Sequence, residues 1–119
     1  MITGKNETKK MNWITLDKEA QVEEIIQKSF EKPQLIYKHS ISCPTSSMAK
    51  HRLEKSVAPE TIDFYYLDIL NHRPISNKIA SDFQVRHESP QILLIKDGRS
   101  VYNISHHRIQ MEDIVAEAM

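Results

Sequence analysis

Two spacings of hydrophobic residues recur along the chain and predict a domain of alternating strands and helices. Short apolar or aromatic runs are typical of buried strands, whereas apolar residues three or four positions apart fit one face of a helix. The predicted strands are 13–15, 35–38, 63–67, 91–95 and 101–104. Each of the four predicted helices has apolar residues on its inward face. In chain order these are Val22, Ile25, Ile26 and Phe30; Met48, Ala49, Leu53 and Val57; Ile75, Ile79, Ala80 and Phe83; and Met111, Ile114, Val115 and Ala118.

Local signals mark several ends of these elements. Asp17 is a predicted N-cap of the first helix. Pro44 and Pro74 suit first helical turns, where the missing N–H would be unpaired in any case. Asp97-Gly98 fits a two-residue hairpin turn between the last two strands. The resulting order is β-α-β-α-β-α-β-β-α, which predicts an α/β fold. Strands joined by helices should be parallel with right-handed crossovers, and the last two should form an antiparallel hairpin.

Composition limits the size of the fold and the class of partner. The 119 residues allow one domain with a real core, which we place at 13–119 after a polar N-terminal tail at 1–12. The 16 basic and 16 acidic residues balance, which argues against nucleic acid as a partner. No run is long enough to span a bilayer, and the polar N-terminus does not read as an export signal. With a single cysteine, the expected location is the reducing cytoplasm.

The single cysteine, Cys43, stands between the predicted strand 35–38 and the predicted helix that Pro44 opens. A thiol at a helix N-terminus faces free backbone N–H groups and the positive end of the helix dipole. Both favour thiolate over thiol, and a thiolate attacks disulfides to form a mixed disulfide. A lone cysteine is often only a small buried hydrophobe. Its polar neighbours and Pro44 favour the reactive interpretation here.

Ser46 occupies the position two residues beyond Pro44 where a dithiol enzyme carries its second cysteine. A hydroxyl cannot form the second disulfide, so an external thiol must resolve the intermediate, although Ser46 could donate a hydrogen bond to the thiolate. Ser89-Pro90 precedes a strand, and we predict that this peptide bond is cis, leaving the Ser89 backbone to pair with a substrate. His39 could assist the thiolate as an imidazolium or be purely structural.

Other polar residues are expected to be ordinary surface groups. Lys38, Lys50 and Arg86 are expected to be solvated charges, although they could form a basic rim. His106 and His107 are adjacent and would point apart on a strand, so no metal site is predicted.

Three segments together resemble the monothiol branch of the bacilliredoxin family, related to bacillithiol-linked general stress proteins. They are Lys38 to Ser46, His87 to Gln91 and Ser105-His106, and the resemblance extends from Trp13 to Met119. It implies a thioredoxin-like fold with a central mixed sheet and helices on both faces. In that arrangement the strand after Pro90 runs antiparallel to the strand before Cys43, which brings the two residues together.

The resemblance also implies an activity and a set of site residues. The expected protein is a thiol–disulfide oxidoreductase that removes bacillithiol from mixed disulfides on client proteins, with bacillithiol as co-substrate and no bound cofactor. Cys43, Pro44 and Ser46 form the catalytic set, and Thr45, His39 and Ser89-Pro90 the substrate contacts. One alternative is a stress-response binding module with Cys43 as a redox sensor. Another is an iron–sulfur carrier, but such sites usually have a flexible glycine where Pro44 stands.

Overall fold

The computed structural model describes residues 11–119, so most of the predicted tail lies outside the described residues. Within them the elements follow the predicted order. The strands are β1 (Ile14–Thr15), β2 (Gln34–His39), β3 (Asp63–Asp68), β4 (Gln91–Lys96) and β5 (Arg99–Ser105). The helices are α1 (Ala20–Lys28), α2 (Pro44–Lys55), α3 (Arg73–Phe83), α4 (Met111–Ala118) and the short 3-10 helix η2 (His106–Arg108). None of the described helices is both long and apolar enough to cross a membrane.

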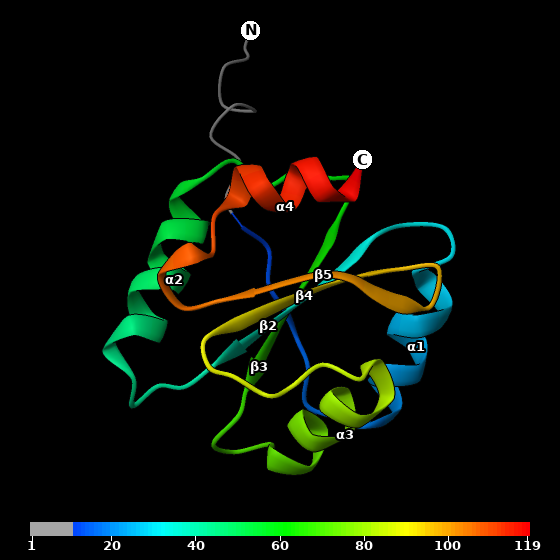
Figure 1. Cartoon of the computed structure of the whole chain (residues 1–119), viewed down its shortest axis with the longest axis horizontal. Coiled ribbons are helices and arrows are strands. Elements are labelled where there is room, and N and C mark those ends of the chain that lie inside the picture. The colour runs from blue at the N-terminus through cyan, green and yellow to red at the C-terminus, as the bar shows by residue number, and fades with distance from the viewer. Residues whose placement is uncertain (1–10) are drawn as a thin grey trace, which may run out of the picture.

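The strands form one mixed sheet in the order β1-β3-β2-β4-β5. β3 is parallel to β1 and to β2, while β4 runs antiparallel to both β2 and β5. The predicted α/β fold is therefore confirmed. The register pairs Lys38 with Gln91, so the C-terminal end of β2 lies beside the start of β4 (Figure 1). This arrangement brings Pro90 to the end of the sheet from which the chain continues to Cys43.

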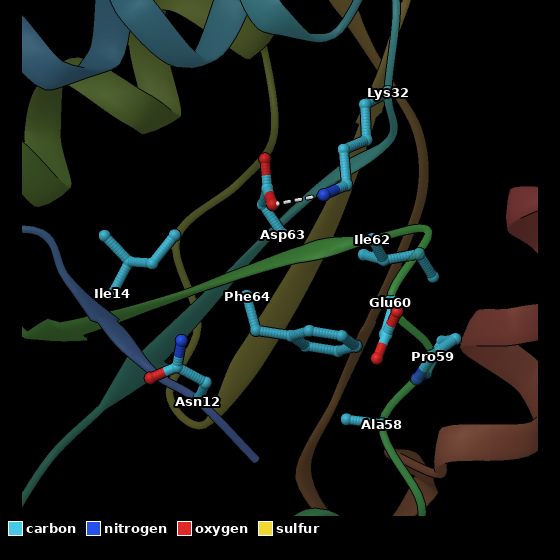
Figure 2. A pocket seen from close by; sticks show the side chains of 9 residues that line it. All are labelled: Asn12, Ile14, Lys32, Ala58, Pro59, Glu60, Ile62, Asp63 and Phe64. Carbon is cyan, nitrogen blue, oxygen red and sulfur yellow. Dashed lines mark ion pairs between the residues drawn. The ribbon is translucent and has the colours of Figure 1, made fainter. Parts of the chain in front are cut away.

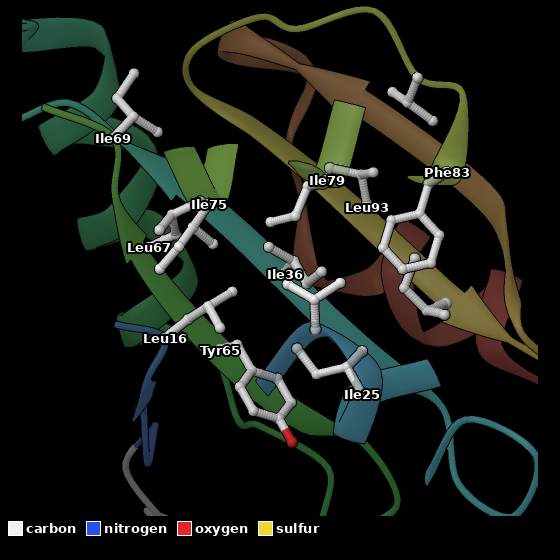
Figure 3. Packing of buried hydrophobic residues seen from close by; sticks show 13 residues of the cluster. Leu16, Ile25, Ile36, Tyr65, Leu67, Ile69, Ile75, Ile79, Phe83 and Leu93 are labelled. Atoms are coloured by element: carbon white, nitrogen blue, oxygen red, sulfur yellow. The ribbon is translucent and has the colours of Figure 1, made fainter. Parts of the chain in front are cut away.

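Helices cover both faces of the sheet, with α2 and α4 on one side and α1 and α3 on the other (Figure 1). Successive residues of β2 therefore point into two different cores. Leu35 and Tyr37 pack with α2 and α4 residues, whereas Ile36 joins the cluster under α1 and α3 (Figure 3). A middle strand covered on both faces is buried along its whole length, and every residue of β2 is buried.

Three residues predicted to face inward are exposed instead. Phe30, Met48 and Val57 have exposed fractions of 59%, 66% and 60%. Phe30 and Val57 lie beyond the ends of α1 and α2, so the helical spacing does not apply to them. Met48 precedes the buried Ala49 in α2. Adjacent helical residues point about 100° apart, so only one of this pair can lie at the centre of the buried face.

The predicted N-cap and the predicted hairpin turn have different outcomes. Asp17 is not an N-cap, because α1 begins at Ala20. The side-chain carbonyl of Gln21 instead accepts hydrogen bonds from the N–H groups of Asp17 and Lys18, at 2.8 and 2.9 Å. The hairpin turn is confirmed, since Asp97 and Gly98 both have positive φ, 53° and 83°. Positive φ at both central residues is what a type I′ turn requires.

Candidate functional site

Cys43 is half-buried and caps the N-terminus of α2. Its backbone is extended (φ −110°, ψ 114°), and Pro44 occupies the first turn. The Cys43 carbonyl accepts the first hydrogen bonds of the helix, from the N–H groups of Ser46 and Ser47 at 3.0 and 3.2 Å. The sulfur therefore lies at the positive end of a 12-residue helix, where an anion is stabilised. Thr45 follows in the same turn and is partly exposed.

Ser46 faces the interior, and its hydroxyl serves buried partners rather than the thiol. Its Oγ lies 2.7 Å from His39 Nδ1, and it accepts a hydrogen bond from the Ser40 N–H at 3.1 Å. The Tyr37 hydroxyl is 3.3 Å from the same Oγ and donates to the Ser46 carbonyl at 2.6 Å. The predicted hydrogen bond from Ser46 to the thiolate is thus replaced by a network that joins the first turn of α2 to β2.

His39 is packed inside the domain beside the first turn of α2. It is 4% exposed, and its ring lies between those of Tyr37 and Tyr66, with centroids at 5.7 and 5.3 Å. Burial, with the nearby Lys50 ammonium, lowers the pKa of His39, so the ring is neutral at neutral pH. Ser46 Oγ and Nδ1 of the neutral ring share one hydrogen bond, which ties the end of β2 to the first turn of α2.

The Ser89–Pro90 peptide bond is cis, as predicted. Pro90 is buried and directly precedes Gln91, which pairs with Lys38. Its carbonyl accepts a hydrogen bond from the His106 N–H at 2.9 Å. The Ser89 hydroxyl is buried and has no hydrogen-bond partner within residues 11–119. Cys43 and the Ser89–Pro90 segment therefore occupy the same end of the sheet, on neighbouring strands.

Lys38 is not the solvated charge that the sequence analysis expects; its side chain is fully buried. Its Nζ lies 3.2 Å from His87 Nδ1. The His87 Nδ1 atom is also 3.2 Å from Ser76 Oγ. Burial lowers the pKa of Lys38 to about 8. This cluster joins β2 and α3 to the segment before Pro90. The sequence did carry a signal for this burial. Lys38 comes two residues after the buried Ile36, so both side chains point to the same face of a strand that has helices on both sides.

A second feature missed by the sequence analysis follows β5. His106 does not continue the strand; it opens η2 with a left-handed backbone (φ 60°). Before it, the Ser105 hydroxyl donates a hydrogen bond to the Glu88 carboxylate. After it, Arg52 of α2 donates to the carbonyls of Ile109 and His107, at 3.0 and 3.4 Å. The η2 segment therefore ties α2 to the segment that contains Pro90.

The pocket drawn in Figure 2 lies away from this site. It has a volume of about 230 Å³ and lies where β2 and β3 begin, whereas Cys43 follows the end of β2. Its lining includes the ion pair of Lys32 and Asp63, with 2.9 Å between Nζ and Oδ1. None of the predicted site residues lines it.

Comparisons with known proteins agree with this geometry. A sequence model of the family described as monothiol bacilliredoxin BrxC matches residues 14–114. A solved structure described as having a thioredoxin fold is 31% identical, with a TM-score of 0.78 over 89% of this chain and 93% of that chain. Thioredoxin from Malassezia sympodialis is 14% identical (TM-score 0.70, 90% and 89% covered). Thioredoxin f from spinach chloroplast is 13% identical (TM-score 0.71, 92% and 96% covered). These last two similarities establish the thioredoxin fold alone.

Proposed function

Because the chain belongs to the monothiol bacilliredoxin family, we propose that it removes bacillithiol from mixed disulfides on client proteins, with Cys43 as the nucleophile. The family and the thioredoxin fold support a thiol–disulfide oxidoreductase. The choice of bacillithiol as the small thiol is the finer part of the proposal.

The proposed first step transfers bacillithiol from the client to Cys43. The Cys43 thiolate attacks the bacillithiol sulfur of the mixed disulfide, forms a new sulfur–sulfur bond and breaks the old one. The client cysteine leaves as a thiolate and takes a proton from solvent. In the second step a free bacillithiol thiolate attacks the sulfur bound to Cys43, which releases Cys43 and bacillithiol disulfide. In the balance, one client disulfide and one bacillithiol become one client thiol and one bacillithiol disulfide.

The observation that carries this proposal is the combination of one thiol at a helix N-terminus with a serine at position 46. The helix end stabilises negative charge by about 0.3–1 kcal/mol, which favours both the attacking thiolate and its release. Because the Ser46 hydroxyl is buried and bonded to His39, it neither resolves the mixed disulfide nor competes for the sulfur. An external thiol has to complete the cycle, which agrees with a monothiol mechanism.

The remaining roles follow from position. Thr45 in the first turn and the Ser89–Pro90 segment, through the Ser89 backbone, are the proposed substrate contacts. His39 acts through Ser46 and does not contact the substrate. No bound cofactor is proposed; the partners are bacillithiol and bacillithiolated proteins, and the proposed location is the cytoplasm, where a thiol pool completes the second step.

The test is intact mass spectrometry after incubation with bacillithiol disulfide. We expect the wild type to gain the mass of one bacillithiol and Cys43→Ser to gain none. A catalytic amount of protein should then release bacillithiol from a modified client over many turnovers when bacillithiol is supplied. Capping of Cys43 without turnover would contradict the enzyme and support the redox-sensing binding module instead.

A further inference from the structure

The outer face of α2 carries an open groove that leads away from the thiol. It has a volume of about 630 Å³ and is lined by Ser47, Met48, His51, Arg52, Lys55 and Ser56. Ser47 lies in the first turn, where its N–H bonds to the Cys43 carbonyl. The groove therefore starts one turn from the nucleophile and follows α2 to its last residue, Lys55, on the side opposite the buried Ala49 and Leu53.

The groove combines a positive charge with an apolar floor. Arg52 and Lys55 are cationic, and no carboxylate belongs to the lining. The exposed side chain of Met48, at 66%, and the aliphatic stems of the two cations supply the apolar surface. The chain as a whole has no net charge, so this is a local excess. The nearest acid of α2, Glu54, is engaged by Lys50 at 2.6 Å and by the Trp13 indole at 2.7 Å.

Part of the groove is held rigidly. The Arg52 guanidinium is fixed by its hydrogen bonds to the carbonyls of Ile109 and His107. A cation held in place in this way loses less side-chain freedom on binding than a mobile one, so the groove is partly organised before a partner arrives.

We propose that this groove binds an acidic segment with apolar residues, next to the modified cysteine of the client. This inference rests on the proposed function and adds to it the chemistry by which clients are chosen. The 12 residues of α2 span about 18 Å, the length of five or six extended residues. The matching carboxylates should therefore lie about three to six positions from the client cysteine.

Charge disfavours the other occupants. Residues 1–10 contain three lysines and one glutamate, so their sign is that of the groove. A second copy of the chain related by two-fold symmetry would place two such basic faces against each other. An acidic client segment has the complementary charge, and charge complementarity both speeds association and selects partners.

The test uses two peptides that differ only in having aspartates or lysines at positions three to six from a central residue. In the binding arm the central residue is serine, and labelled peptide is titrated with the full-length protein by fluorescence anisotropy. In the kinetic arm it is bacillithiolated cysteine, and release of bacillithiol is followed. The variants are Lys55→Glu and, as the matched control, Lys28→Glu, an exposed lysine on α1 at the opposite face.

We expect the wild type to bind the acidic peptide about tenfold more tightly and to process it correspondingly faster at low salt. Lys55→Glu should reduce this preference about fivefold, while Lys28→Glu should leave it unchanged. Equal binding of both peptides, or equal effects of the two variants, would overturn the inference. If neither peptide binds, the inference also fails. A preference in binding without bacillithiol release from either peptide would support the groove and overturn the proposed function.

Discussion

Replacing Lys38 by methionine tests the unusual burial of a charged group in the middle strand. The Lys38 side chain is fully buried and its Nζ hydrogen-bonds a neutral imidazole nitrogen of His87. Burial lowers the pKa of Lys38 to about 8, from an ordinary value of 10.5. Because the folded pKa is below the unfolded one, the unfolded chain binds more protons between these values. The free energy of unfolding should therefore rise with pH across this interval.

The size of the effect follows from the two pKa values. At pH 7 the burial of Lys38 costs about 3 kcal/mol of stability relative to an exposed lysine, and at pH 9.5 about 1 kcal/mol remains. The wild type should gain about 2 kcal/mol between these pH values. Lys38→Met removes the titrating amine and keeps a long apolar side chain, so its stability should be nearly independent of pH there. At pH 7 the variant should be the more stable protein.

Other perturbed groups titrate outside this interval. Burial lowers the pKa of His39 and of His87, so these rings lose their protons below pH 7 in both states. Burial raises the pKa of Tyr37 and of Tyr65 to about 12. Their effect is a loss of stability that begins only near pH 10, where unfolded tyrosine ionises. The interval from pH 7 to 9.5 therefore isolates Lys38.

The assay is urea unfolding at several pH values, followed by the fluorescence of Trp13, the one tryptophan of the chain. A Cys43→Ser background removes the reactive thiol from the comparison. Lys28→Met, at an exposed position, is the matched control and should follow the wild type. The reasoning is refuted if Lys38→Met keeps the wild-type slope, or if the wild type gains no stability between pH 7 and 9.5.

Three further substitutions test the packing. Ser46→Ala leaves buried partners unpaired and should lower the free energy of unfolding in urea by about 1–3 kcal/mol. The same change at the neighbouring exposed Ser47 should cost almost nothing, and equal losses would argue against the buried network. Leu53→Ala should cost about 2–5 kcal/mol because the side chain is fully buried, and Met48→Ala, on the exposed side, within about 0.5 kcal/mol of zero; a reversed ranking would contradict the orientation of α2. Gly98→Ala should cost about 1–2 kcal/mol at φ 83°, measured by thermal melting, and an unchanged midpoint would be inconsistent with the turn.

The order of helices and strands could be predicted because short local sequence signals mark where the elements begin and turn. Prolines open α2 and α3, and the Asp97-Gly98 pair requires a hairpin wherever it stands between two strands. Once helices were assigned between the early strands, the parallel pairing of β2 with β3 followed from connection rules. The position of Cys43 at the start of α2 followed from Pro44 in the same way.

Three of the errors concern properties that depend on neighbours distant in sequence. Helical spacing allowed either Met48 or Ala49 to face the sheet, and only the placement of α2 decides between them. The burial of Lys38 depends on α3 and on the segment that carries His87. The hydrogen-bond partner of Ser46 could not be predicted either. It depends on the position of His39 at the end of β2 and not on how near Ser46 is to Cys43 along the chain.

The hydrogen bond from Tyr37 to position 46 has a consequence for how this enzyme class could diversify. The tyrosine hydroxyl donates to the carbonyl of Ser46, an atom that every residue type provides. The anchor of the first turn of α2 therefore survives any exchange of the side chain at position 46. Under the proposed cycle, Ser46→Cys would turn a one-thiol reaction into a two-thiol one while the nucleophile stays in place. The backbone carbonyl of residue 46 thus holds the helix in place, while its side chain sets how many thiols of the protein take part in the reaction. A single codon change separates the two modes of turnover.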